Sequence, residues 1–127
     1  MKVIWAAMLA CCATGSWAGD LPSGQETTLI DSLLEEQSGT GETWLVLRYL
    51  APRIARGAGD LTYEDVALDL DRLCETDGLE ALRLTSADVA QIVIILMDRE
   101  VPRGTPDPDA AMFISAYEPS ENGCIWQ

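Results

Sequence analysis

The clearest pattern of hydrophobic and polar positions lies between Thr62 and Gly78. Apolar side chains recur there at helical spacing and form one continuous face. Thr62, followed three residues later by Asp65, has the spacing of a capping box, and Gly78 is placed to end the helix. The same periodicity puts Asp69 on the opposite, solvent-facing side. The apolar face consists of Tyr63, Val66, Ala67, Leu70, Leu73 and Cys74.

Runs of apolar and β-branched residues predict several strands. Residues 43–50 carry branched and aromatic side chains and end before Pro52, which has no amide hydrogen for a sheet ladder. Residues 91–97 are almost continuously apolar, which is typical of a central strand covered on both faces. Residues 112–117 and 124–126 predict two further strands near the end of the chain.

Residues 27–37 fit two different elements. Their apolar positions suit one face of a helix that begins at a capping box. Residues 38–41 form a glycine-containing turn that leads directly into the strand over 43–50, as in a hairpin. The turn favours a strand pair, but the sequence leaves helix and strand open. The preceding residues 19–26 hold two glycines and a proline, and we expect them to form a loose arm.

Together these elements predict one small α+β domain over residues 19–127. It should contain a mixed sheet of about five strands and one principal amphipathic helix. The turn-rich segment 98–109, with three prolines, should form a surface loop of restricted flexibility.

Residues 1–18 have the composition of a cleavable signal peptide. Lys2 precedes an apolar run, and small residues lead to a cleavage site after Ala18. The apolar run is too short to span a bilayer, which takes about 20 residues. We therefore expect a periplasmic or secreted protein, with lipoprotein anchoring at Cys11 as the lesser alternative.

Removal of this leader leaves two cysteines, Cys74 and Cys124. An even number of cysteines in an oxidising compartment predicts a disulfide bond. The bridge would close a loop of about 50 residues and stabilise the fold by about 4 kcal/mol.

Composition excludes several kinds of chemistry. The chain has 21 acidic residues and no histidine, and its single lysine, Lys2, lies in the leader. Seven arginines against these acids give the processed chain a formal charge of −14, which repels nucleic acid and anionic lipid. The lack of histidine excludes catalytic triads and histidine metal sites, and the lack of lysine excludes bound pyridoxal phosphate. We expect no cofactor and no metal.

A candidate binding site depends on how two strands are arranged. If the strands over 43–50 and 91–97 are parallel, the loops that follow them leave the sheet at the same edge, where open sheets usually bind ligands. An arginine cluster there could hold a carboxylate, a phosphate or an acidic partner. The alternative is that each arginine pairs with a nearby acid and ties down a loop. The four arginines are Arg53, Arg56, Arg99 and Arg103.

These features favour a non-catalytic binding or accessory module of the cell envelope, which binds a partner protein or a small anion. The alternative is a small hydrolase that works with paired carboxylates and without histidine, at residues the sequence does not identify. Trp44 and Trp126 could offer a stacking surface, although core packing is their expected use.

Short segments along most of the chain resemble the landmarks of a family of small exported bacterial proteins of unknown function. Members of that family keep the same two cysteines, so the resemblance supports a bridge between Cys74 and Cys124. It implies no activity. The segments are Arg48–Pro52, Asp69–Cys74, Gln91–Ile94, Asp98–Pro102 and Cys124–Trp126.

Overall fold

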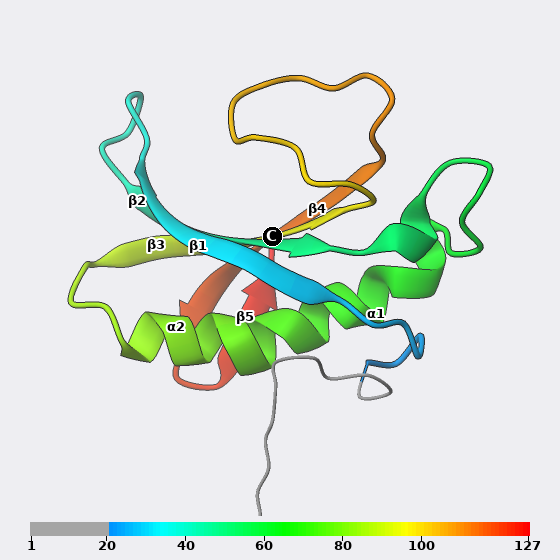
Figure 1. The fold of residues 1–127 in the computed structure, drawn as a ribbon. Helices are drawn as coiled ribbons and strands as arrows, with labels where there is room; N and C mark the ends of the chain where they lie inside the picture. The colour runs from blue at the N-terminus through cyan, green and yellow to red at the C-terminus, as the bar shows by residue number, and fades with distance from the viewer. Residues whose placement is uncertain (1–20) are drawn as a thin grey trace, which may run out of the picture.

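A five-stranded mixed sheet organises the computed structural model, which describes residues 21–127 (Figure 1). The predicted leader, Cys11 and the cleavage site near Ala18 lie outside the described residues. The strands lie in the order β1-β2-β3-β4-β5, and only the β2–β3 pair is parallel. The sheet and the single domain agree with the predicted α+β class. The strands are β1 (Thr28–Glu36), β2 (Thr43–Leu50), β3 (Val89–Met97), β4 (Met112–Ser120) and β5 (Gly123–Trp126).

The segment that the sequence left open is a strand. β1 pairs antiparallel with β2, with Leu34 opposite Leu45, and the pairing is irregular only near Leu29. Two backbone hydrogen bonds of 2.7 Å close the connecting turn, from Gln37 N to Glu42 O and from Gly41 N to Gln37 O. Gly41 has a φ of 76°, which glycine adopts without strain. The hairpin turn therefore outweighs the helical spacing of the apolar residues.

One helix runs along the sheet from Tyr63 to Arg83. It contains α1 (Tyr63–Leu73), a π-helical turn (Cys74–Gly78) and α2 (Leu79–Arg83). Both hydrogen bonds of the predicted capping box between Thr62 and Asp65 are present. The prediction that Gly78 ends the helix is wrong. Gly78 lies inside it because the absence of a side chain lets the helix approach β3: a Cβ there would lie 3.1 Å from Ile92 Cγ2.

The two faces of the sheet have separate cores. On one face, Leu47 and Ile94 pack with the helix residues Val66 and Leu70. On the other, a cluster that includes Val46, Val93 and Ile95 is covered by Val101 and Ala110 from the loop between β3 and β4. Figure 1 shows the helix below the sheet and this loop, in yellow to orange, above it. β3 is therefore central and covered on both faces, as predicted.

The first described residues are anchored, which corrects the expectation of a loose arm. Leu21 and Gln25 are buried. The backbone and hydroxyl of Ser23 and the Gln25 amide all donate hydrogen bonds to the Asp69 carboxylate. Asp69 is therefore buried and does not face solvent, because these donors compensate the loss of water around its charge.

Candidate functional site

The parallel register of β2 and β3 brings two arginine-bearing segments to one edge of the sheet. Leu50 lies opposite Met97, and the next amide, Ala51 N, donates to Met97 O at 2.6 Å. The segments that leave the two strands therefore start side by side. We call Arg53, Arg56 and Arg99, which lie on these segments, the arginine edge.

Each arginine of this edge donates hydrogen bonds to a neighbouring acidic side chain or backbone carbonyl. Arg53 donates to both oxygens of Asp60 at 2.8 and 2.7 Å, and Arg99 donates to Asp98 Oδ2 at 3.2 and 3.1 Å. Arg56 joins the two segments, since its Nη1 donates to Pro108 O at 2.9 Å. The arginine side chains of the two ion pairs are about half exposed, at 45% and 50%. These contacts match the alternative in which arginines tie down loops.

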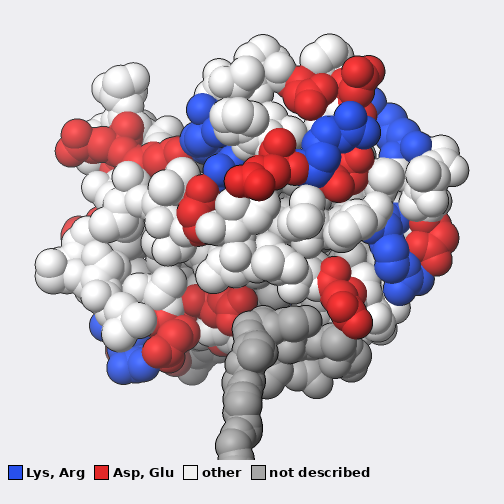
Figure 2. Space-filling view, viewed as in Figure 1, with Lys and Arg blue, Asp and Glu red and all other residues white. Residues whose placement is uncertain are grey.

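Acidic side chains give the arginine edge a mixed charge. The hydrogen bond from Arg53 lowers the pKa of Asp60. Burial raises the pKa of Asp98, but hydrogen bonds from the Ala111 amide and from Arg99 outweigh this effect and lower it. Figure 2 shows basic and acidic side chains interleaved on the visible face, without a continuous basic patch.

Arg103 lies apart from the other three arginines. Its Nε and Nη2 donate to Glu35 at 2.6 and 2.7 Å. Glu35 is opposite Trp44 near the start of β2, which is the end of the sheet away from Leu50. The hydrogen bonds from Arg103 lower the pKa of Glu35. The segments that carry Arg53, Arg56 and Arg99 therefore start at one edge of the sheet, whereas Arg103 is bound near the other end.

A fifth arginine, Arg48, was missed by the sequence reasoning. It is 6% exposed and donates to both oxygens of Asp31 at 2.9 and 2.8 Å. Its Nη1 donates to Val101 O at 2.5 Å, in the loop that covers the second face. The sequence could have identified Arg48, because it is the single charged residue in the otherwise apolar second half of the strand over 43–50.

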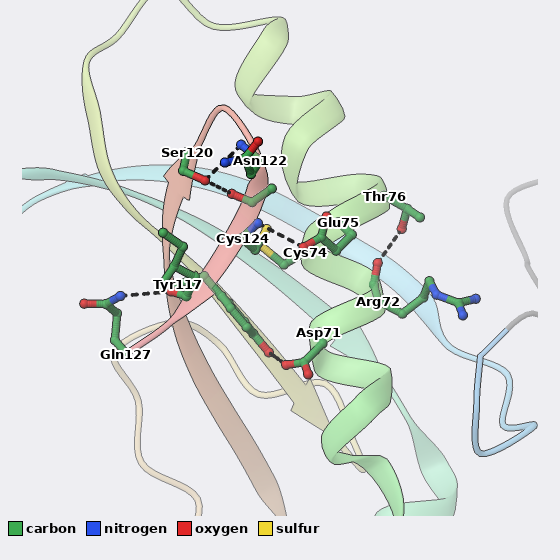
Figure 3. The surroundings of a disulfide bond; sticks show 12 residues. Asp71, Arg72, Cys74, Glu75, Thr76, Tyr117, Ser120, Asn122, Cys124 and Gln127 are labelled. Carbon is green, nitrogen blue, oxygen red and sulfur yellow. Dashed lines mark hydrogen bonds between the residues drawn. A yellow bond between two sulfur atoms is a disulfide. The ribbon is translucent and has the colours of Figure 1, made fainter.

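The predicted Cys74–Cys124 disulfide is present and joins the π-helical turn to β5 (Figure 3). Nearby, Trp126 is 66% exposed. Core packing was therefore the wrong expectation for Trp126, because β5 is a short edge strand and Trp126 is its last residue. Trp44 is partly buried against the second core, and its indole donates to Glu42 Oε1 at 3.0 Å.

Trp126 borders a hollow between α1 and the last two strands, which we call the aromatic hollow. Tyr117 donates from its hydroxyl to Asp71 Oδ1 at 2.7 Å beside it (Figure 3). Burial raises the pKa of Tyr117, which keeps the hydroxyl protonated as the donor. Tyr63 packs edge-on against Phe113, with ring centroids 5.5 Å apart. The hollow is lined by Tyr63, Ala67, Asp71, Ser115 and Trp126, with a volume of about 330 Å³.

Helix carboxylates other than Asp69 also accept hydrogen bonds from other parts of the fold. Asp77 accepts a hydrogen bond from the Tyr49 hydroxyl at 2.9 Å, and Glu75 accepts one from Cys124 N at 2.9 Å. With Asp69 and Asp71, they link the helix to the sheet and to the N-terminal residues. Burial raises the pKa of Tyr49, so this hydroxyl also stays protonated.

Neither a metal cluster nor a membrane-spanning helix is found in residues 21–127. No group of three or more acidic or cysteine side chains there could hold a metal ion. No helix within that range is both long and apolar enough to cross a bilayer.

Comparison with known proteins gives a family but no activity. The model of a family described as "Family of unknown function (DUF6497)" matches residues 4–127. No curated protein and no solved structure matches the chain.

Proposed function

We propose that this chain, which belongs to the family of unknown function DUF6497, is an exported binding module of the cell envelope without catalytic activity. Its arginine edge would hold a carboxylate or phosphate group, carried by a small anion or by an acidic partner protein. One observation carries this proposal: the segments that bear Arg53, Arg56 and Arg99 leave the parallel strands β2 and β3 side by side, at one edge of the sheet.

A ligand could displace the acidic side chains from the ion pairs at this edge. Ion pairs between exposed side chains contribute little to stability, because water competes for both charges. A ligand with two oxygens could therefore replace Asp60 on Arg53 or Asp98 on Arg99 at small cost. Guanidinium groups suit such a ligand because their N–H donors match two oxygens at once.

Export is supported by sequence and by the disulfide together. The leader over residues 1–18 has the features of a signal peptide. Disulfides persist mainly in oxidising compartments such as the bacterial periplasm or the cell exterior. The Cys74–Cys124 bridge is therefore consistent with a protein that works outside the cytoplasm.

The hydrolase alternative gains little from the described residues. A carboxylate pair for hydrolysis needs one acid whose pKa is raised by burial. Glu42 and Glu118 line a common hollow of about 340 Å³ at the other end of the sheet, but both residues are exposed. The buried Asp69 is enclosed by Ser23 and Gln25. These acids therefore favour structural roles over acid catalysis.

The test is calorimetric titration of the purified protein with inorganic phosphate and with the acidic peptide Ac-Gly-Glu-Gly-Glu-Gly-NH2. We expect at least one probe to bind, and Arg53→Ala combined with Arg99→Ala to weaken it about tenfold or more. Arg83→Ala is the matched control, since Arg83 also forms an exposed ion pair, with Glu80, away from the edge. Binding of phosphate indicates a small anion, and binding of the peptide alone indicates an acidic partner. No binding, or equal loss in the control, would show that the arginines are only scaffolding.

A further inference from the structure

The aromatic hollow presents two aromatic side chains and a carboxylate that the arginine edge does not use. Trp126 is 66% and Tyr63 41% exposed, and both line the hollow together with Asp71. Ser115, also on the wall, is 5% exposed. The site thus combines two exposed aromatic residues with a carboxylate and a buried hydroxyl-bearing residue, which is the composition of a ligand site.

The backbone at Trp126, the last residue of β5, is held by contacts with its neighbours. It pairs with Tyr117 across the β4–β5 ladder, and Gln127 N donates to Ala116 O at 3.0 Å. Two residues earlier, Cys124 is bonded to Cys74 on the helix. The backbone that carries the indole is therefore fixed before any ligand arrives, which lowers the entropic cost of binding.

The charge of the hollow is negative. The ion pairs within residues 21–127 join arginines to Asp31, Glu35, Asp60, Glu80 and Asp98, so Asp71 is not among the acids they neutralise. Asp71 accepts a hydrogen bond from the Tyr117 hydroxyl at 2.7 Å. Glu75, one helical turn further, lies beside the disulfide, whereas the Arg72 side chain extends to the opposite side of the helix (Figure 3).

We infer that the aromatic hollow is a second binding site, which takes an arginine side chain from a basic partner protein. A guanidinium stacks on indole and phenol faces through cation–π attraction and donates paired hydrogen bonds to a carboxylate. Trp126, Tyr63 and Asp71 supply these two kinds of contact around one hollow. The formal charge of −13 on the whole chain would speed the approach of such a partner.

The test is an NMR titration of the purified protein with the basic peptide Ac-Gly-Arg-Gly-Arg-Gly-NH2, observed at the tryptophan indole N–H signals. We expect the Trp126 signal to shift and to saturate, and the Trp44 signal to stay unchanged. Asp71→Asn should weaken binding about tenfold, because the amide keeps an acceptor for Tyr117 but loses the charge. Asp77→Asn is the matched control, since Asp77 also accepts a tyrosine hydroxyl on the same helix, and it should change the affinity less than twofold.

Three results would overturn the inference. The first is an equal Trp126 shift with Ac-Gly-Glu-Gly-Glu-Gly-NH2. The second is equal weakening by Asp77→Asn and Asp71→Asn, which would reflect net charge alone. The third is a Trp126 shift with a neutral disaccharide but not with the arginine peptide, which would indicate a sugar site. Arg53→Ala with Arg99→Ala should leave the arginine peptide's affinity unchanged, so this proposal and that of the arginine edge can fail separately.

Discussion

The helix below the sheet and the loop above it cover the same central strand by different means. Most backbone N–H and C=O groups of the helix form hydrogen bonds within the helix, and its apolar face packs against the sheet. The loop between β3 and β4 has no such ladder and depends on side chains: Arg48 donates to Val101 O, and Asp98 accepts from Ala111 N at 2.7 Å. Arg103 adds a link from the loop to Glu35 on β1.

The two faces of the sheet are therefore stabilised by different kinds of interaction. The helix-covered face has the larger core and a disulfide, neither of which responds to protonation of a carboxylate, and hydrogen bonds to helix carboxylates such as Asp69 and Asp77 add to them. The loop-covered face has a smaller core and relies on ion pairs in which Asp31 and Glu35 must be ionised. Loss of the disulfide or of apolar packing should therefore act mainly on the first face, and loss of the arginine ion pairs mainly on the second.

Removal of the disulfide should give the largest effect. Cys74→Ala with Cys124→Ala releases a loop closed across 50 residues of sequence separation, which costs about 4 kcal/mol of unfolding free energy in the chain-entropy model. Urea unfolding followed by circular dichroism measures this loss.

A reducing agent provides the control for that experiment. It should lower the stability of the wild-type protein toward that of the double variant and leave the variant unchanged. A double variant as stable as the oxidised wild type would contradict the importance assigned to the bridge on the helix-covered face.

Loss of the buried arginine should give the next largest effect. Arg48→Met removes the donors to Asp31 and to Val101 O, and we expect a loss of about 2–3 kcal/mol. Urea unfolding gives the size, and amide hydrogen exchange should show faster exchange in the loop than in the helix. Arg83→Met, which breaks an exposed ion pair, should have no measurable effect.

A second substitution tests whether the loss of stability comes from the unpaired Asp31 carboxylate. Asp31→Leu in the Arg48→Met background removes the carboxylate that the first change leaves without its partner, and it should restore part of the stability. If Arg48→Met alone is neutral, then apolar packing by Val101 and Ala110 suffices to hold the loop, and the contrast between the two faces fails.

Most of the fold could be predicted from the sequence because periodicity encodes it. The helix face, the capping box and the central strand all follow from local spacing of apolar and polar residues. The placement of Arg53, Arg56 and Arg99 on segments that leave one edge of the sheet follows from one further assumption, that β2 and β3 are parallel, which the register confirms.

The contacts that were not predicted join segments far apart in the sequence. Asp69 was placed in solvent because its helix alone has polar residues on that side, and the residues that cover it lie 44 to 46 positions earlier. Arg103 reaches Glu35 across 68 positions. Periodicity states which side of an element a residue faces, but it does not state which distant segment folds over that side.

Acid pH should give the smallest effect and should act on the loop-covered face. The hydrogen bonds from Arg48 lower the pKa of Asp31. A carboxyl whose pKa is lower in the folded than in the unfolded protein stabilises the fold above its unfolded pKa of about 4, and this contribution is lost as the pH falls through the folded pKa. Between pH 5 and 3 (roughly the window set by that pKa) the wild type should therefore lose more unfolding free energy than Arg48→Met, whose Asp31 lacks the arginine.

Equal losses in urea unfolding of the two proteins would show that Asp31 titrates alike in the folded and unfolded chains. In that case the buried arginine holds the loop through the Val101 carbonyl, and the two faces would differ in geometry but not in their response to charge.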